Sequence, residues 1–253
     1  MVTTTRLTVP LLIFDVAGHL AHFRRPDTAV THATYPFPTR TALRGMLGAI
    51  LGRPEWVDTE YEAWTGVRIL NPIRTRAQEL SMLGKGWFGN GDAFNRPTAI
   101  ELVVEPAYRI YYTGPDGEEL AERIRQRRSH FPTYLGSAYA LTVPRFVAWE
   151  EAEEVGVRAG VSEGALHATP DGPLESPAVV PTHAVLDVEP VPGRVYARVG
   201  GVLHTHLGGR RFRRSLNFLY EPNGRAIRFW PAPGPYDPPV RWVRCSDGLV
   251  CLW

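Results

Sequence analysis

The stretch "HATYPFPTRTALRGMLGAILG", residues 32–52, joins a proline-braced turn to a glycine-spaced amphipathic segment. Each proline favours extended backbone in the residue before it, so Tyr35 and Phe37 form a stiff approach. Thr39 is typical of a helix N-cap, and the apolar spacing after it predicts a helix over 40–51. Such a helix packs on a sheet through its apolar face, which here carries Leu43, Met46, Leu47 and Ile50.

Arg40, Arg44 and Gly48 share another face of this helix. The first turn of a helix offers free backbone N–H groups and the positive end of the dipole, which together attract anions. Glycine in turn lets a ligand backbone come close. The residues alone leave two interpretations about equal: a site for a phosphate backbone, and a tight contact between helix and sheet beside solvated arginines.

The surrounding pattern predicts an α+β fold. An apolar run over 6–18 indicates a buried central strand. The order strand, helix, strand, strand, helix, strand up to residue 155 is typical of a ferredoxin-like or RRM-type domain over 1–155. Turn signals every ten or so residues predict a smaller β-rich C-terminal domain over 156–253. The intermediate elements expected are a short helix within 58–66, strands at 67–80 and 98–114, a helix over 116–129 and a strand from 141.

Composition limits the class of protein. The chain has 253 residues, 44% of them hydrophobic, with 24 glycines and 23 prolines, which suits a β-rich fold. No apolar run approaches the roughly 20 residues of a membrane span, and the first residues lack a secretory pattern, so we expect a cytoplasmic protein. Cys245 and Cys251 are the only cysteines and form no CxxC pair, so we expect no metal and no cofactor.

The positive charge is clustered. Residues 194–228 hold eight arginines and one acid, and residues 17–53 hold five arginines and one acid. Both are candidate surfaces for a polyanion. Lys85 is the only lysine, and such a preference for arginine can come from the base composition of the gene. The number of arginines is therefore not evidence for polyanion binding, whereas their clustering is. In the first stretch, "GGVLHTHLGGRRFRR" (200–214) predicts a hairpin tip or a strand that presents guanidinium groups.

An insertion over 74–97, "RTRAQELSMLGKGWFGNGDAFNRP", interrupts the predicted domain. Aromatic side chains in a flexible basic loop suit the stacking of nucleic-acid bases, at about 1–3 kcal/mol per base. A hairpin whose aromatics tuck into its own domain explains the pattern nearly as well. The residues that carry the first interpretation are Arg74, Arg76, Lys85, Trp87, Phe88, Phe94 and Arg96.

The sequence contains no familiar catalytic motif. His19, His22, His32 and Tyr35 lie close together, and histidine with tyrosine can cleave RNA by general acid–base chemistry without metal. This gives a rival function, a metal-independent endoribonuclease. His204 and His206 alternate on a predicted strand, but no third ligand lies nearby, so a structural role is favoured for both.

Two longer motifs resemble those of a known protein family. "GHLAHFRRPDT" followed by "TYPFPTRTALRGMLGAILG" resembles the N-terminal signature of the CRISPR-associated Cas-five family, and "LNPIRTR" and "HFPTYLGSAY" follow in the order that family shows. The similarity covers roughly 7–146 well and is closest to the type I-B-like branch. It implies a fold of the repeat-associated (RAMP) superfamily with an inserted β-hairpin thumb at about 76–97.

The resemblance also implies a function: a non-catalytic subunit of a type I Cascade surveillance complex that caps the 5′ handle of the crRNA in antiviral defence. Its partners would be a Cas-seven-type backbone subunit, a Cas-eight-type large subunit and, through the complex, target DNA. The type I-C branch cuts precursor RNA with a tyrosine and a lysine–histidine pair, whereas Gly86 follows the only lysine here. The candidate RNA-binding residues are Arg24, Arg25, Tyr35, Thr39, Arg40, Arg44, Arg210 and Arg211, together with the seven named in the insertion. A scaffold subunit that touches no RNA is the third alternative.

Overall fold

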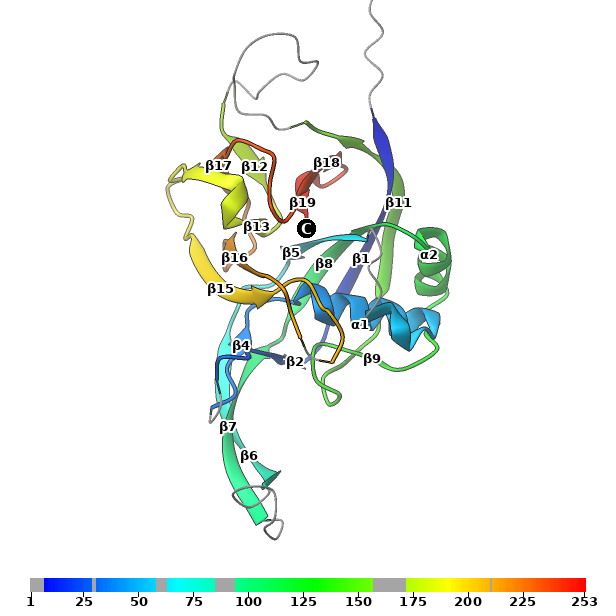
Figure 1. The fold of residues 1–253 in the computed structure, drawn as a ribbon, viewed down its shortest axis with the longest axis vertical. Coiled ribbons are helices and arrows are strands. Elements are labelled where there is room, and N and C mark those ends of the chain that lie inside the picture. Colours follow the sequence, from blue (N-terminus) through cyan, green and yellow to red (C-terminus); the bar gives the residue numbers. More distant parts are fainter. Residues whose placement is uncertain (1–6, 29–30, 58–62, 85–93, 157–171, 210) are drawn as a thin grey trace, which may run out of the picture.

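A six-stranded antiparallel sheet forms the centre of the molecule (Figure 1). The computed structural model describes residues 7–28, 31–57, 63–84, 94–156, 172–209 and 211–253. The strand order is β19-β18-β11-β1-β8-β5. These strands are β1 (Thr8–Ala17), β5 (Trp64–Ile69), β8 (Ala107–Thr113), β11 (Arg145–Glu154), β18 (Arg241–Cys245) and β19 (Gly248–Leu252).

The middle of strand β1, Leu11–Phe14, is apolar because both of its faces are buried there. Leu12 and Phe14 belong to the main core, which includes Leu47 and the other buried helix residues. Leu11 and Ile13 point to the opposite face, into a second buried cluster with Tyr111, Val243 and Leu252. The sheet therefore has a core on each side, and a single-sided amphipathic pattern is not expected for its central strand.

Two α-helices, α1 (Arg40–Leu51) and α2 (Gly117–Arg125), pack against the first of these faces and contact each other. The Thr39 side chain caps α1 by accepting from the Ala42 N–H, and Gly52 ends it in the left-handed conformation. The expected helix over 40–51 and its cap are thus confirmed. Among the described residues, two 3₁₀ turns complete the helical part, η1 (Pro54–Val57) and η3 (Thr182–Ala184).

Some predicted elements were wrong. Residues 64–66 are strand rather than helix, because Gly66 passes close to β19; a Cβ there would lie 2.8 Å from the Cys251 oxygen. Residues 58–62 of that expected helix lie outside the described residues. The expected strands 67–80 and 98–114 are each divided in two, the second at Glu105, whose φ of 49° turns the chain before a proline.

A long hairpin leaves the sheet between β5 and β8 and projects from the body (Figure 1). It consists of β6 (Thr75–Gly84) and β7 (Phe94–Val104), paired from Thr75 with Val103 to Gly84 with Phe94. Its base is anchored by buried Ile100, Leu102 and Val103. Short strands lie beside this base: β2 (Leu20–Ala21) pairs with β7, while β3 (Phe23–Arg24) pairs with β4 (Thr34–Tyr35).

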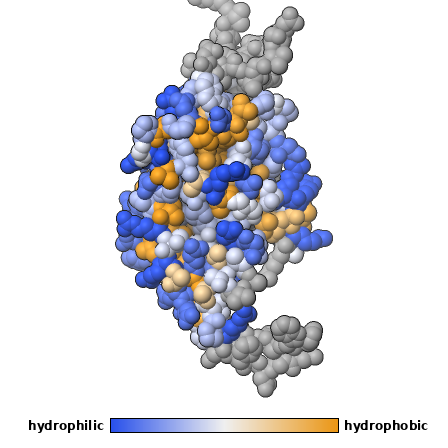
Figure 2. Space-filling view, turned by 90° about the vertical axis from the view of Figure 1, so that its left-hand side faces the viewer, coloured by the Kyte–Doolittle hydropathy of each residue, from blue (hydrophilic) through white to orange (hydrophobic). Residues whose placement is uncertain are grey.

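Most of the chain after residue 172 forms small sheets that share the main core through Phe218 and Phe229, whereas β18 and β19 join the central sheet. On the side that these strands occupy, apolar and charged side chains intermix (Figure 2). Among the described residues, no helix has the length and apolar character needed to cross a membrane. The remaining strands are β9 (Thr133–Tyr134), β10 (Leu141–Thr142), β12 (Leu174–Ser176), β13 (Val180–Pro181), β14 (Val185–Val188), β15 (Ala197–Leu203), β16 (Ser215–Tyr220) and β17 (Ile227–Pro231).

A charged network ties the C-terminal turn to the middle of the sheet. Arg109 on β8 donates to Asp15 on β1 at 2.7 Å and to Asp247 in the β18–β19 turn at 3.0 Å. The Tyr111 hydroxyl also donates to Asp247, at 2.7 Å. Burial alone would raise the pKa of Asp247, but the hydrogen bonds from Tyr111 and Arg109 hold it below its usual value.

We predict that Asp247→Asn lowers the free energy of unfolding by about 1–3 kcal/mol at pH 7, because the charged acceptor of the hydrogen bonds from Arg109 and Tyr111 is lost. Since the pKa of Asp247 is lower in the folded state, its contribution is present at neutral pH and is lost as the pH falls through the folded-state pKa. Urea titrations should therefore show that the difference in free energy of unfolding between wild type and variant becomes smaller towards pH 3. Asp187→Asn, at an exposed carboxylate, is the control. An equal effect of both changes would contradict the network's role.

The glycines of α1 give a second prediction. A Cβ at Gly48 would lie 2.7 Å from the Arg53 oxygen and 3.1 Å from the Trp56 Cβ, whereas Gly45 borders an open groove. Gly48→Ala should lower the free energy of unfolding by about 1–3 kcal/mol through overpacking. Gly45→Ala should raise it by up to about 1 kcal/mol through helix propensity. Equal urea midpoints for the two variants would show that Gly48 is not needed for packing.

Candidate nucleic-acid interface

A groove of about 330 Å³ lies between the first half of α1 and the segment 132–136. One wall is the helix face that carries Thr41 and Gly45, and the other contains Tyr134 and Gly136. The residues that line it are Phe23, Arg24, Thr39, Thr41, Ala42, Gly45, Met46, Ala49, Pro132, Thr133, Tyr134 and Gly136.

The second wall is held in place by backbone contacts. The Leu135 carbonyl accepts from the His22 N–H at 3.1 Å, and the Leu135 side chain is fully buried. Gly136 has a φ of 83°, and a Cβ there would lie 2.1 Å from the His22 oxygen. Only glycine fits at this position. The wall that carries Tyr134 is therefore a fixed part of the fold.

The groove combines chemistry suited to a single-stranded nucleotide chain. Tyr134 keeps 44% of its surface exposed and offers a ring face for a base. Arg24 is exposed beside it and supplies a cation for a phosphate. Thr41 adds a hydroxyl on the first turn of α1, whose dipole also favours an anion. The groove can thus accept a base, a sugar and a phosphate together.

Further positive charge stands along strand β7 of the hairpin. His32 bridges to Ile100 of β7, so it lies beside the strand that carries exposed Arg96. Burial, and after it the charge of Arg24, lowers the pKa of His32; Arg96 acts in the same direction. Of the predicted residues, Arg24 and Arg96 are far apart in the sequence, yet both lie near enough to His32 to lower its pKa.

The helix face that carries Arg40 and Arg44 is covered by other parts of the chain. Arg44 is only 6% exposed; it donates to the Trp56 carbonyl at 3.3 Å and lies over the Trp56 ring. Arg40 donates to the Ala63 carbonyl at 3.2 Å. Burial, and then the charge of Arg44, lowers the pKa of Arg40 to about 10. The expectation of an open phosphate site is corrected, because the chain after α1 packs on this face.

Three other predicted residues have structural roles. The Thr39 side chain is the cap of α1 and borders the groove. The Tyr35 hydroxyl donates to the Gly201 carbonyl at 2.6 Å and ties β4 to β15. Arg25 pairs with Asp27 at 2.7 Å and lies over the Tyr35 ring. Tyr35 is buried and is therefore not an RNA-facing side chain in this structure.

The hairpin presents part of the predicted basic and aromatic set. Arg74 and Arg76 are exposed, and Arg76 donates to Gln78 at 3.3 Å. Arg96 pairs with Met82 across the two strands, so the two residues share a face. Phe94 belongs to β7, opposite Gly84. Three predicted residues, Lys85, Trp87 and Phe88, lie outside the described residues.

The basic stretch 194–228 forms a hairpin whose turn lies at 207–211, as its double glycine indicates. Arg211 is exposed at this tip, and Arg210 lies outside the described residues. Much of the remaining charge is compensated, so the stretch is a weaker polyanion surface than its composition suggests. The ion pairs are Arg194 with Glu175, Arg228 with Glu189 and Arg214 with Asp237.

The histidines of the rival ribonuclease hypothesis are only partly brought together. The rings of His22 and His32 stack with 6.4 Å between centroids, and burial lowers the pKa of both, so both are neutral at pH 7. His22 is held by the Glu101 carbonyl at 2.8 Å, while the Tyr35 hydroxyl is engaged elsewhere. Within the described part of the chain, no three histidine, cysteine or acidic side chains are placed to hold a metal.

Tyr134 is the residue that reasoning from sequence missed. It lies in "RRSHFPTYLGSAY" (127–139), where exposed Phe131, Tyr134 and Tyr139 follow two arginines. This is the same combination of aromatic and basic residues that drew attention to the insertion. The available signal was the density of aromatics in a glycine- and serine-containing loop, but a loop pattern does not tell which rings stay exposed.

Comparisons with known proteins agree with this architecture. Two solved structures cover nearly the whole chain: one described as a "CRISPR RNA-guided surveillance complex" (TM-score 0.53, 16% identity, 88% of this chain and 91% of that chain) and one of a CRISPR protein from Archaeoglobus fulgidus (TM-score 0.53, 9% identity, 96% and 98%). At these identities they show a shared mixed α+β fold. No curated protein matches the chain.

The sequence itself matches a protein family over residues 11–173, which is more than half of the chain. The family is described as "CRISPR-associated protein (Cas_Cas5)". The matched region contains β1, α1, the hairpin, α2 and β11, and so includes both walls of the groove. The chain therefore belongs to the Cas5 family of CRISPR-associated proteins.

Proposed function

We propose that this protein is a non-catalytic RNA-binding subunit of a type I Cascade complex, and that it caps the 5′ handle of the crRNA. The observation that carries the proposal is the groove beside α1, where exposed Tyr134 and Arg24 face the first turns of a capped helix. A ring, a cation and a helix N-terminus in one hollow match the base and phosphate of single-stranded RNA.

The strand order supports a ferredoxin-like identity for the N-terminal domain. β1, α1, β5, β8, α2 and β11 follow the order of that fold, and β11-β1-β8-β5 are consecutive antiparallel neighbours. In this proposal the β6–β7 hairpin is the thumb, and Arg96 on β7 extends the positive surface from Arg24 along it. The handle then runs from the hairpin base into the groove.

The proposed neighbours are a Cas-seven-type backbone subunit along the thumb and a Cas-eight-type large subunit, in a cytoplasmic complex of the type I-B-like branch that meets target DNA through its other subunits. The rival, cleavage of precursor crRNA without metal, is disfavoured by the position of Tyr35. Its hydroxyl is bound to a backbone carbonyl across the molecule. Burial also raises the pKa of Tyr35, away from that of a general base.

We predict that Arg24→Ala with Arg96→Ala weakens binding of labelled repeat RNA, because two phosphate contacts are lost. In a plot of log affinity against log salt, the slope should fall by about 1.4, at roughly 0.7 per contact. Fluorescence anisotropy from 50 to 300 mM salt measures this, and the control is Arg125→Ala with Arg244→Ala, two exposed arginines elsewhere. An unchanged slope in the first variant would remove Arg24 and Arg96 from the interface.

A cleavage assay with the same labelled RNA distinguishes the proposed function from the rival endoribonuclease. In EDTA the RNA should stay intact with the wild-type protein. Clean cleavage by the wild type that disappears in Tyr35→Phe or His32→Ala would replace the proposal with the endoribonuclease. Crosslinks of the assembled complex that join this chain to proteins alone would instead favour a scaffold subunit.

The hairpin gives a second functional prediction. Replacing residues 82–94 by a Gly-Ser turn should leave the thermal unfolding midpoint within a few degrees of wild type, because the body's core lies outside that segment. Retention of guide RNA by the purified complex should fall about tenfold or more, through loss of the thumb. Native retention would refute the thumb assignment. Unfolding of the variant would show that the aromatics of the insertion belong to the core.

A further inference from the structure

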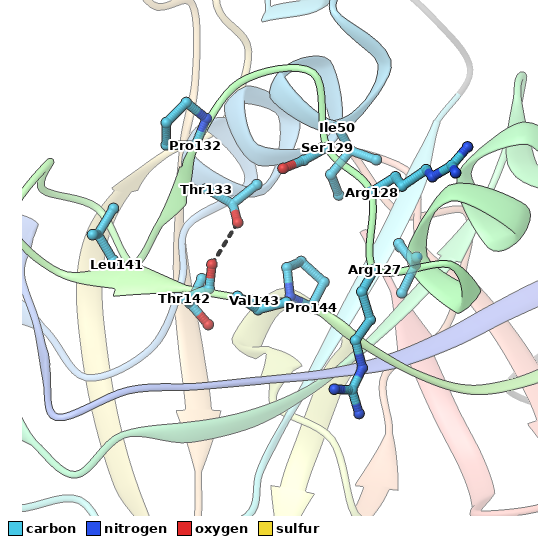
Figure 3. Close-up of a pocket in the computed structure, with 11 residues that line it drawn as sticks. Ile50, Arg127, Arg128, Ser129, Pro132, Thr133, Leu141, Thr142, Val143 and Pro144 are labelled. Atoms are coloured by element: carbon cyan, nitrogen blue, oxygen red, sulfur yellow. Dashed lines mark hydrogen bonds between the residues drawn. The ribbon is translucent and has the colours of Figure 1, made fainter.

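A second hollow, of about 210 Å³, lies on the other side of β9 from the groove (Figure 3). It is bounded by the end of α1, the end of α2 and the segment 141–144. The Thr133 hydroxyl donates to the Thr142 carbonyl at 2.6 Å across its mouth, which fixes the two strands that frame it. The apolar side chains that line the hollow are Ile50, Ile124, Pro132, Leu141, Val143 and Pro144.

This lining is aliphatic and partly open to solvent. Leu141 and Val143 are 64% and 60% exposed, and no aromatic ring lines the hollow. Proteins that hold single-stranded RNA stack its bases on aromatic rings, as the groove does with Tyr134. The volume is also below the roughly 300–1,000 Å³ of small-molecule sites. One or two aliphatic side chains from another protein fit it better.

Two arginines flank the hollow. Arg127 and Arg128 follow α2, and Figure 3 shows their guanidinium groups directed away from the centre of the hollow, at its rim. Both are exposed, and neither forms an ion pair within the described part of the chain. On the helix itself, Arg123 and Arg125 are paired with Glu119 and Glu122. The rim thus carries positive charge that the chain does not compensate.

The backbone is strained where this charge is placed. Arg127 has a φ of 54°, in the left-handed region that usually takes glycine or asparagine after a helix. Its N–H donates to the Ile124 carbonyl at 3.0 Å, and the next N–H, that of Arg128, donates to Arg123 at 2.8 Å. These bonds hold the conformation. An arginine at a glycine position points to a role for its side chain.

We propose that this hollow docks a protein segment that inserts an aliphatic side chain between Ile124 and Val143 and places flanking acidic residues against Arg127 and Arg128. The aliphatic lining of the hollow favours an aliphatic side chain in its centre. The unpaired charges of Arg127 and Arg128 favour acidic residues on either side of that side chain. The hollow shares only Pro132 and Thr133 with the RNA groove and the proposed contacts use neither, so the docking site stands or falls separately from the proposed function.

The test places a photo-reactive benzoylphenylalanine at Val143 of the full chain, in cells that express it with the neighbouring genes. Mass spectrometry then identifies the crosslinked peptide. We expect a protein segment with an aliphatic residue flanked by aspartate or glutamate. The same reagent at exposed Glu118, on the opposite end of α2, is the control. A crosslink to RNA, to a segment without acidic residues, or to nothing above the control overturns the proposal.

Reversing the charge of the two arginines provides a second test of the docking site. Arg127→Glu with Arg128→Glu should lower the crosslink yield from position 143 about tenfold or more, because like charges then face each other. Changing the acidic residues of the identified segment to arginine should restore the yield. Arg198→Glu, at an exposed position on β15, is the matched control. RNA binding measured on the same variants should be retained. An unchanged yield, or no rescue, overturns the assignment of the rim.

Discussion

The structure depends on the closure of its central sheet upon itself. Thr65 on the edge strand β5 exchanges two backbone hydrogen bonds, of 3.3 and 2.9 Å, with Trp253 at the other edge. Arg109 reinforces the closure by bridging Asp15 and Asp247. The contact between Thr65 and Trp253 covers one end of the edge strand β5, and the Val179 N–H, which donates to the Val67 carbonyl, covers its middle. Closure also fixes β5, from which the hairpin leaves, relative to the helix that borders the groove.

The groove is positioned by what packs against the two faces of α1. One face meets the chain after the helix, where Gly48 allows close approach and Arg44 lies over Trp56. The other face is left open because the segment 132–136 packs against the His22 carbonyl, at Gly136, instead of against the helix. The glycine stripe thus has a packing role at Gly48 and a role in the groove at Gly45. The close-packing interpretation therefore holds at Gly48, while the binding of a phosphate backbone beside this helix stays a prediction.

The sequence predicted the local elements well and their surroundings poorly. The cap Thr39, the helix 40–51 and the buried strand β1 follow from patterns within a few residues. The burial of Arg44 does not, because periodicity identifies a face of a helix but not the segment that covers it. Tyr134 was missed for the same reason: its exposure depends on a contact between residues more than a hundred positions apart, Gly136 and His22. Long-range contacts of this kind leave no local signal.

The short strand β9 separates two hollows of different chemistry. Tyr134 lines the groove with its ring, while Thr133 lines both hollows. Because each hollow is framed by rigid neighbours, the fold keeps a surface suited to nucleic acid and a surface suited to an acidic protein segment a few residues apart. A subunit with the proposed function, which would hold one end of an RNA inside a larger assembly, needs both kinds of contact side by side. The arrangement around β9 provides them from one segment, 127–144, whose arginines and aromatic rings serve opposite sides of the same strand.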